Sequence, residues 1–261
     1  MNKNKLYFNS PIGVIGLGYV GLPLAYELSK KYFVQAFDKS LDRVSQLMNN
    51  IDITNQIAKK KLIKISKKIE YSSDIKKLKN CKIYIIAVPT PVYSNKKPDL
   101  RNLKSISKNI SKIIKKDDII IYESTVYPGV TEEICVPLIE KFSNLKLNKD
   151  FYVGYSPERI NPGDKTRQLT DIVKITSASN NYSLSIINKL YNSIIKAGTK
   201  KVSSIKIAES AKVIENAQRD INIAFINEVA KICSKLNISI YDVLDASNTK
   251  WNFLPFLPGL V

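Results

Sequence analysis

The sequence of 261 residues contains no histidine. Imidazole is therefore unavailable as a general base, as the middle member of a Ser-His-Asp triad, or as a metal ligand. Any acid–base chemistry has to come from glutamate, aspartate, lysine or water. We accordingly expect no metal site in this chain.

Cysteine is also scarce, and the three cysteines are Cys81, Cys135 and Cys233. An odd number without Cys-x-x-Cys spacing favours reduced thiols over a disulfide framework or a zinc site. No apolar run reaches the roughly 18 residues that a transmembrane helix needs. Residues 1–9 lack the apolar core of a signal peptide. These absences predict a cytoplasmic protein with no membrane segment.

Acidic residues are outnumbered, with 23 Asp and Glu against 41 Lys and Arg, so the formal net charge is +18. The lysines are spread along the chain and do not cluster beside interleaved aromatic residues, so we expect no nucleic-acid partner. The positive field favours the approach of anionic nucleotide substrates. With 44% hydrophobic residues, the chain is long enough for one complete domain and part of another.

The stretch at 12–21, Ile-Gly-Val-Ile-Gly-Leu-Gly-Tyr-Val-Gly, places a G-x-G-x-x-G motif directly after an apolar run. In this motif the first glycine permits a tight turn, the second lets the backbone approach a pyrophosphate, and the third lets the next helix pack on the sheet. The helix N-terminus favours the negative phosphates. The alternative is a glycine-rich turn that binds nothing. The candidate cofactor-binding residues here are Gly16, Gly18, Tyr19, Val20 and Gly21.

A second apolar stretch, 33–37, ends at Asp38, which lies 22 residues after Gly16. A carboxylate at this position accepts hydrogen bonds from both ribose hydroxyls and repels a 2′-phosphate. The pattern therefore predicts NAD rather than NADP as the cofactor. Arg43 is a further candidate cofactor-binding residue, and its positive charge leaves NADP open.

Apolar strands alternate with helical segments over roughly the first 200 residues, which predicts an α/β fold of the Rossmann type with a doubly wound parallel sheet. We expect further strands at 69–72, 82–88, 118–122, 151–155 and 172–176. We expect helices at 41–48, at 99–116 and from Thr131, which would be its N-cap, with the lysine-rich stretch 59–68 as a solvated continuation of the first of these.

Polar motifs follow several of the expected strands. They are Pro-Thr-Pro at 89–91, Glu-Ser-Thr-Val-Tyr-Pro-Gly at 123–129 and Ser-Pro-Glu-Arg-Ile-Asn-Pro-Gly at 156–163. Doubly wound folds bind ligands at the carboxyl edge of the sheet, so these motifs, with Thr90 in the first, are expected to line the site.

From Ile205 the sequence lacks helix breakers and predicts one long helix that reaches about Leu236. Lys212 and Asn216 share a face of this helix, and Glu209 lies one turn earlier. Spacing alone favours a solvated face for these three side chains. We place an NAD-binding domain at 1–203 and part of a helical central domain at 204–261. Apolar residues recur along the helix at 207, 208, 211, 214, 221, 225, 229 and 232.

Together, the glycine motif, Ala-Val-Pro-Thr-Pro, Glu-Ser-Thr-Val-Tyr-Pro-Gly, Ser-Pro-Glu-Arg-Ile-Asn-Pro-Gly-Asp-Lys and the Lys212/Asn216 helix resemble the UDP-glucose/GDP-mannose dehydrogenase family. The fourth motif looks like the branch that oxidises UDP-N-acetylhexosamines, such as UDP-N-acetylgalactosamine or UDP-N-acetylglucosamine. The resemblance implies that a UDP-sugar is the substrate. Its C6 alcohol would be oxidised to a carboxylate with two NAD molecules, for polysaccharide or surface-glycan biosynthesis.

The same resemblance implies roles for individual residues. Lys212 and Asn216 would stabilise the negative charge that builds on the reacting oxygen. Thr125 would order a catalytic water, and Glu158 would accept protons and help to hydrolyse a thioester. Thr90 and Thr125 would flank the nicotinamide. We also expect a homodimer, because half of a central domain cannot cover the apolar residues of the long helix.

In this family the nucleophilic cysteine follows Pro-Gly-Leu-Val within a Gly-Gly-His-Cys motif, and the chain ends at Pro258-Gly259-Leu260-Val261. We therefore expect the N-terminal portion of a nucleotide-sugar dehydrogenase, without its nucleophile and its C-terminal UDP-binding domain, and inactive by itself. Two alternatives stay open. One is a truncated NAD-binding remnant, and the other is a two-domain NAD dehydrogenase of the hydroxyacid type.

Overall fold

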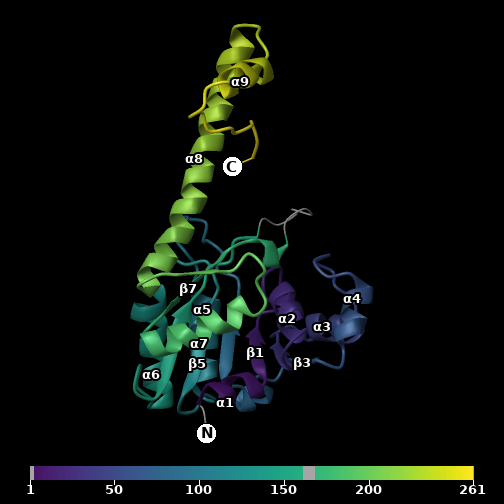
Figure 1. The fold of residues 1–261 in the computed structure, drawn as a ribbon, viewed down its shortest axis with the longest axis vertical. Coiled ribbons are helices and arrows are strands. Elements are labelled where there is room, and N and C mark those ends of the chain that lie inside the picture. Colours follow the sequence, from purple (N-terminus) through teal and green to yellow (C-terminus); the bar gives the residue numbers. More distant parts are fainter. Residues whose placement is uncertain (1–2, 161–167, 261) are drawn as a thin grey trace. The chain divides into compact units, whose positions relative to one another are not determined.

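The computed structural model describes residues 3–160 and 168–260. The chain divides into two compact units, Met1–Ser210 and Ala211–Val261. Within the described residues, the strands are β1 (Ile12–Ile15), β2 (Val34–Phe37), β3 (Ile69–Ser72), β4 (Ile83–Ile86), β5 (Asp118–Tyr122), β6 (Phe151–Tyr155), β7 (Lys174–Ala178) and β8 (Thr199–Lys201). The α-helices there are α1 (Lys3–Asn9), α2 (Gly21–Ser29), α3 (Leu41–Met48), α4 (Lys59–Ile65), α5 (Arg101–Ser111), α6 (Val136–Ser143), α7 (Asn181–Asn192), α8 (Ile205–Lys235) and α9 (Ile240–Asn248) (Figure 1).

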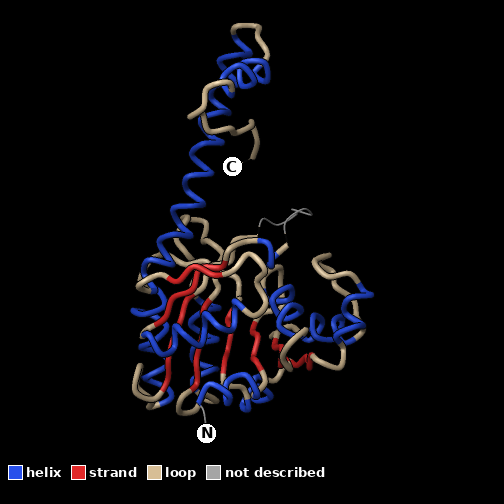
Figure 2. Tube along the Cα trace, viewed as in Figure 1, coloured by secondary structure: helices blue, strands red, loops and turns tan. Residues whose placement is uncertain are grey.

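In the described part of the chain, the eight strands form one sheet in the order β3-β2-β1-β4-β5-β6-β7-β8 (Figure 2). The chain proceeds from β1 toward one edge through β2 and β3, and then crosses back to β4 on the other side of β1. This arrangement confirms the predicted doubly wound α/β fold. The order reverses between β1 and β4, and such a reversal is where these folds bind ligands, at the carboxyl ends of the strands.

One strand departs from the expected parallel sheet. Strand β7 runs antiparallel to β6, with Gly154 opposite Ala178. Parallel neighbours need a long crossover, usually a helix. The described residues between these two strands contain only a 3₁₀ turn, Leu169–Asp171. The prediction of parallel pairing is therefore wrong at this position, and β7 and β8 pair parallel to each other beyond it.

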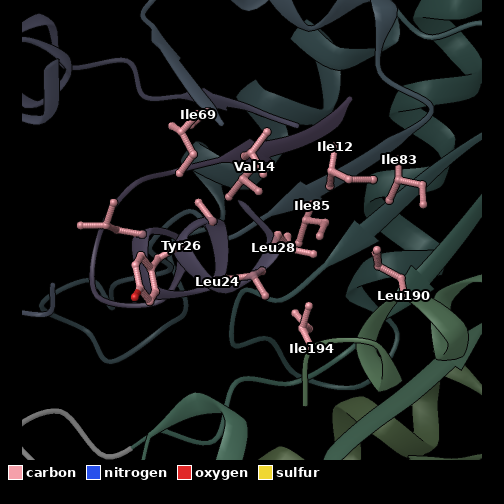
Figure 3. Packing of buried hydrophobic residues seen from close by; sticks show 14 of the residues in the cluster. Ile12, Val14, Leu24, Tyr26, Leu28, Ile69, Ile83, Ile85, Leu190 and Ile194 are labelled. Atoms are coloured by element: carbon pink, nitrogen blue, oxygen red, sulfur yellow. The ribbon is translucent and has the colours of Figure 1, made fainter. Parts of the chain in front are cut away.

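The core lies on both faces of the sheet. On one face Ile12 of β1 stands beside Ile83 of β4, and α2 and α7 cover them with Leu24 and Leu190, all fully buried (Figure 3). On the opposite face α5 packs against β5, where the Ser107 hydroxyl lies 2.8 Å from the Tyr122 hydroxyl. Strands covered on both faces have few polar side chains, which explains their near-continuous apolar sequences.

Several helix boundaries differ from the sequence prediction. The stretch 59–68 is not a solvated continuation of α3 but contains a separate helix, α4, which buries Leu62 and Ile65. Thr131 does not cap a helix. A π-helical turn, Val130–Cys135, begins after Gly129 and leads into α6. Helix α5 is shorter than the predicted 99–116. Among the described α-helices and strands, the sequence analysis did not predict α1, α7, β8 and α9.

In the second unit, the prediction of a long helix is confirmed by α8. The Asn227 side chain on this helix accepts a hydrogen bond from the Gly259 N–H at 3.0 Å and donates one to its carbonyl at 2.8 Å. This pair ties the stretch after α9 to α8. Among the helices described, none combines the length and apolar character needed to cross a membrane.

Candidate functional site

The glycine loop joins β1 to α2 at the carboxyl edge of the sheet. Gly16 has φ +88°, and a Cβ there would lie 2.7 Å from the Ala87 carbonyl oxygen. A Cβ on Gly21 would lie 1.8 Å from the Gly16 oxygen. Both positions therefore require glycine for the fold itself. Gly18 differs, because apart from its two chain neighbours no heavy atom of the described residues lies within 4 Å of a Cβ placed there.

The start of α2 has the form of an anion site. Val20 occupies the N-cap position, and among the described residues no side chain caps this end of the helix. Tyr19 is exposed. The Leu22 N–H binds the Gly18 carbonyl at 3.2 Å, and Pro23 has no N–H. The positive end of the helix dipole lies at this loop and favours a negative group such as a pyrophosphate.

Asp38 follows β2 and lies beside the same loop. Its Oδ2 accepts a hydrogen bond from the Leu17 N–H at 2.8 Å, and its Oδ1 accepts one from the Ser40 N–H at 2.9 Å. The side chain is half-buried. Each oxygen has a lone pair left after these bonds, so the carboxylate is fixed in direction and can still accept from ribose hydroxyls.

The Arg43 side chain contacts the backbone of the glycine loop and a neighbouring aspartate. Its Nε donates to the Leu17 carbonyl at 2.9 Å, and a terminal nitrogen donates to Asp52 Oδ1 at 2.8 Å. Burial raises the pKa of Asp52, but the hydrogen bonds from Thr54, Ile57 and Arg43 outweigh it, so the pKa lies below its ordinary value. These contacts give Arg43 a structural role. Its assignment as a cofactor-binding residue stays a prediction.

The loops that follow β4 and β5 are joined to each other. The Thr90 hydroxyl donates to the Thr125 carbonyl at 2.6 Å, and the Ser124 hydroxyl donates to the Val88 carbonyl at 2.7 Å. Thr125 itself is exposed. The structure therefore brings together the two threonines that the sequence analysis placed beside the nicotinamide.

Glu158 lies just after β6 and is buried. Its Oε1 accepts hydrogen bonds from the N–H groups of Arg159 at 2.5 Å and Ile160 at 2.7 Å. Its Oε2 lies 3.3 Å from the Lys174 ammonium. The rest of this sequence motif, from Asn161 onward, lies outside the described residues.

Lys174 also binds Glu123 at 2.8 Å, and the Tyr191 hydroxyl donates to the other oxygen of Glu123. Burial raises the pKa of Glu123, and Lys174 only partly opposes this effect. Burial lowers the pKa of Lys174, but the two carboxylates raise it further, to above its ordinary value. The sequence analysis missed Lys174 and Tyr191, and it placed Glu123 in a motif at the site without giving it a role. The available signal was a lysine inside the apolar stretch 172–176.

The remaining candidates lie on α8. Lys212 and Asn216 belong to the second unit and are half-buried, and their assignment as catalytic partners of Glu158 stays a prediction. Glu209 belongs to the first unit and is fully buried, so the expectation of a solvated face is wrong for this side chain. Its carboxylate accepts hydrogen bonds from the backbone N–H groups of Gly129 and Thr131. Burial raises the pKa of this carboxyl, and these hydrogen bonds only partly oppose the effect.

A doubly wound sheet, a glycine loop that leads into a helix without a side-chain cap, and a carboxylate after β2 define a Rossmann domain that binds a dinucleotide. Comparison with known families agrees with this class. Residues 10–195 match the NAD binding domain of the UDP-glucose/GDP-mannose dehydrogenase family, and residues 206–261 match its central domain. The chain belongs to this family, and its first domain is an NAD-binding domain.

Individual relatives are similar over nearly the whole chain. A UDP-N-acetyl-D-glucosamine 6-dehydrogenase from Pseudomonas aeruginosa is 52% identical over 250 residues, which are 96% of this chain and 59% of the relative. Protein CapL from Staphylococcus aureus is 52% identical over 97% of this chain and 59% of its own length. The solved structure of a UDP-D-ManNAc dehydrogenase from Pyrococcus horikoshii superposes with a TM-score of 0.89 at 29% identity, covering 95% of this chain and 60% of that one. This chain therefore spans about three fifths of the length of these proteins.

Proposed function

We propose that this protein is a nucleotide-sugar 6-dehydrogenase that oxidises the C6 alcohol of a UDP-N-acetylhexosamine to a carboxylate with two NAD, for polysaccharide or surface-glycan biosynthesis. The observation that carries the proposal is the arrangement at one edge of the sheet. The glycine loop, the Thr90–Thr125 contact and the buried Glu158 all follow strands at their carboxyl ends. The relatives named as UDP-N-acetyl-D-glucosamine 6-dehydrogenases support this choice of substrate class.

The residues at this edge fit NAD. The open space beside Gly18 and the positive end of the α2 dipole suit a pyrophosphate. The carboxylate of Asp38 suits the two hydroxyls of an unphosphorylated ribose. When bound, NAD supplies the acceptor for the hydride that leaves the sugar C6. Thr90 and Thr125 would flank that end of the cofactor.

The chain's own residues would supply the charge and proton chemistry. Hydride leaves an alcohol carbon readily when its oxygen becomes negative, and a cation and an amide donor beside this oxygen stabilise it. Lys212 and Asn216, which are four residues apart on α8, would be these donors. Glu158 would accept the proton, and Thr125 would order the water that attacks later in the reaction.

We also propose that the protein forms a homodimer through α8. Ile214, Ile221 and Phe225 of this helix are 65%, 67% and 61% exposed. Large apolar side chains that recur along one helix at this exposure are typical of a surface that a partner covers. A second copy of the same helix is the partner that we propose.

The test measures NADH production from UDP-N-acetyl-D-glucosamine and from UDP-N-acetyl-D-galactosamine. Because the chain spans 59% of its Pseudomonas aeruginosa relative, the assay uses this chain alone and this chain continued by the remaining part of that relative. We expect the fusion of this chain with the remaining part of the relative, called the continued protein below, to produce two NADH per sugar. In this protein Glu158→Gln should lower kcat by about 100-fold or more. Glu27→Gln removes a different buried glutamate, paired with Lys30 at 2.6 Å, and should keep its activity. Equal activity of Glu158→Gln and wild type would exclude the proposed role of Glu158.

A further inference from the structure

Lys174 is the first residue of β7, and its sequence neighbours Val173 and Ile175 are apolar. The Lys174 side chain is 3% exposed. Its ammonium has three oxygen partners, which are Glu123 Oε2 at 2.8 Å, the Pro157 carbonyl at 3.2 Å and Glu158 Oε2 at 3.3 Å. A buried ammonium has three N–H groups to satisfy, and these three oxygens satisfy them.

The surroundings of Lys174 come from three different elements. Glu123 follows β5, Glu158 follows β6, and Tyr191 belongs to α7. The Tyr191 ring centroid lies 5.4 Å from the Lys174 nitrogen, and its hydroxyl donates to Glu123. Burial raises the pKa of Tyr155, and the nearby carboxylates of Glu209 and Glu123 raise it further, so this phenol stays neutral. One cation therefore serves two carboxylates.

Stability alone does not explain a lysine at this position. Burying an ammonium costs free energy, and an apolar residue of similar size often serves a buried site as well or better. The charge does have a local consequence, because two buried carboxylates without a cation cannot both stay ionised. The lysine is therefore best explained by what it does to the carboxylates.

The contacts of Glu158 show what this effect is. Its Oε1 is held by the two backbone N–H groups of Arg159 and Ile160, and its Oε2 is held by Lys174. The carboxylate is thereby fixed in direction from both oxygens. The backbone bonds come from its own turn, whereas Lys174 reaches this carboxylate with its side chain from another strand.

We propose that Lys174 is a positioning residue for Glu158, whose carboxylate it orients and keeps ionised so that it is ready to accept a proton. This inference rests on the proposed role of Glu158 in proton transfer. Glu123 and Tyr191 hold the other side of the ammonium and keep it directed at Glu158. Lys174 itself does not contact the reacting atoms.

The first experiment measures the ionisation of Glu158 without any turnover. The chain is labelled with ¹³C at the glutamate side-chain carboxyls, the Glu158 signal is assigned with Glu158→Gln, and its chemical shift is followed against pH. In Lys174→Met we expect the Glu158 midpoint to move up by about one pH unit or more, because the cation is lost and Glu123 remains. Lys174→Arg keeps the charge and should return the midpoint close to that of wild type.

A matched control removes another lysine–carboxylate pair from the same sheet. Lys82 binds Asp118 at 2.6 Å near the amino ends of β4 and β5. Lys82→Met should destabilise the fold and leave the Glu158 midpoint unchanged. A midpoint that moves equally in Lys82→Met and Lys174→Met, or in neither, would overturn the inference.

A further measurement covers the case in which Lys174→Met does not fold. In wild-type protein with ¹⁵N-labelled lysine, the Lys174 side-chain nitrogen should shift at the same pH as the Glu158 carboxyl. A Lys174 nitrogen chemical shift that does not change over the pH range in which Glu158 titrates contradicts the inference.

Activity then separates this inference from the proposed function. In the continued protein, Lys174→Met should move the acidic limb of the kcat profile to higher pH and lower kcat by about tenfold, with the KM for NAD nearly unchanged. If the wild type has no activity on any UDP-N-acetylhexosamine, the proposed function fails, while the carboxyl titration still decides whether Lys174 controls Glu158. A kcat profile with an unmoved acidic limb in Lys174→Met counts against the inference alone.

Discussion

The Glu209 carboxylate accepts a hydrogen bond from the Gly129 N–H at 2.6 Å, across 80 positions of sequence. Its other oxygen accepts one from the Thr131 N–H at 3.0 Å. Glu209 lies in the first turns of α8, and Gly129 ends the motif that contains Thr125. The contact therefore ties the loop with a candidate catalytic residue to the start of the long helix.

Replacing Glu209 by glutamine should lower the free energy of unfolding by about 1.5 to 3 kcal/mol, because an amide group then faces a backbone N–H that only an oxygen can satisfy. Urea unfolding measures this loss. Glu228→Gln changes an exposed glutamate on the same helix, paired with Lys231, and should stay within about 0.5 kcal/mol of wild type. Similar losses in the two variants would argue against a special role for the buried carboxylate.

Two glycines of the loop should respond differently to alanine. In Gly21→Ala the new Cβ meets the Gly16 oxygen at 1.8 Å, so we expect a loss of at least about 1 to 3 kcal/mol in stability. In Gly18→Ala the methyl group enters open space, so the melting temperature should change little while NAD affinity falls about tenfold or more. Scanning calorimetry measures the melting temperature of each variant, and titration calorimetry measures its affinity for NAD. Undiminished NAD binding by Gly18→Ala would place the pyrophosphate elsewhere.

Asp38 should determine the choice between NAD and NADP. We expect NAD to bind much more tightly than NADP, and Asp38→Ala to weaken NAD binding by about 1 to 3 kcal/mol through the loss of charge-assisted hydrogen bonds. Asp38→Asn keeps an acceptor for the Leu17 N–H, which Asp38 binds at 2.8 Å. This variant therefore tests the effect of the negative charge while the hydrogen bond to the loop is kept. Equal affinity of wild type for both cofactors by isothermal titration would remove this assignment of Asp38.

Asp52 should make stability depend on acidic pH. Its pKa lies below the ordinary 3.8 in the folded protein, because the hydrogen bonds from Thr54, Ile57 and Arg43 outweigh the effect of burial. Its contribution is therefore complete above pH 3.8 and is lost as the pH falls through the folded-state value.

Asp52→Asn tests this prediction. We expect a loss of about 1 to 3 kcal/mol at pH 7 and a smaller difference from wild type at about pH 3, measured by urea unfolding at both values. Asp42→Asn changes an exposed aspartate on α3 and should match wild type at both. A difference for Asp52→Asn that stays constant from pH 7 to pH 3 contradicts the prediction.

The apolar residues of α8 should hold two copies together. Phe225→Asp places a charge in the proposed interface, and sedimentation velocity should show dimers for wild type and monomers for the variant. Ile63→Asp makes the same kind of change at an exposed position of α4, 52% accessible, and should leave the dimer intact. A wild-type protein that sediments as a well-behaved monomer at micromolar concentration rules this interface out.

Features that depend on neighbouring residues could be predicted from the amino-acid sequence alone. Apolar runs, the spacing of Gly16, Gly18 and Gly21, and an acid after the second strand are local patterns, and strand and turn preferences act over a few residues. For this reason the predicted strands at 69–72, 118–122 and 151–155 coincide with β3, β5 and β6.

The partners of the buried charged side chains depend on contacts between distant parts of the chain. The glycines follow a spacing that a single stretch of sequence reveals, but Lys174 meets Glu123 across 51 positions and Glu209 meets Gly129 across 80. The spacing of residues on the helix predicted a solvent-exposed side chain for Glu209. The residues next to Lys174 in the sequence do not indicate which carboxylates it binds. Whether a charge is solvated or buried depends on which strand ends and turns the fold brings around it, because only nearby opposite charges and hydrogen-bond donors compensate its removal from water.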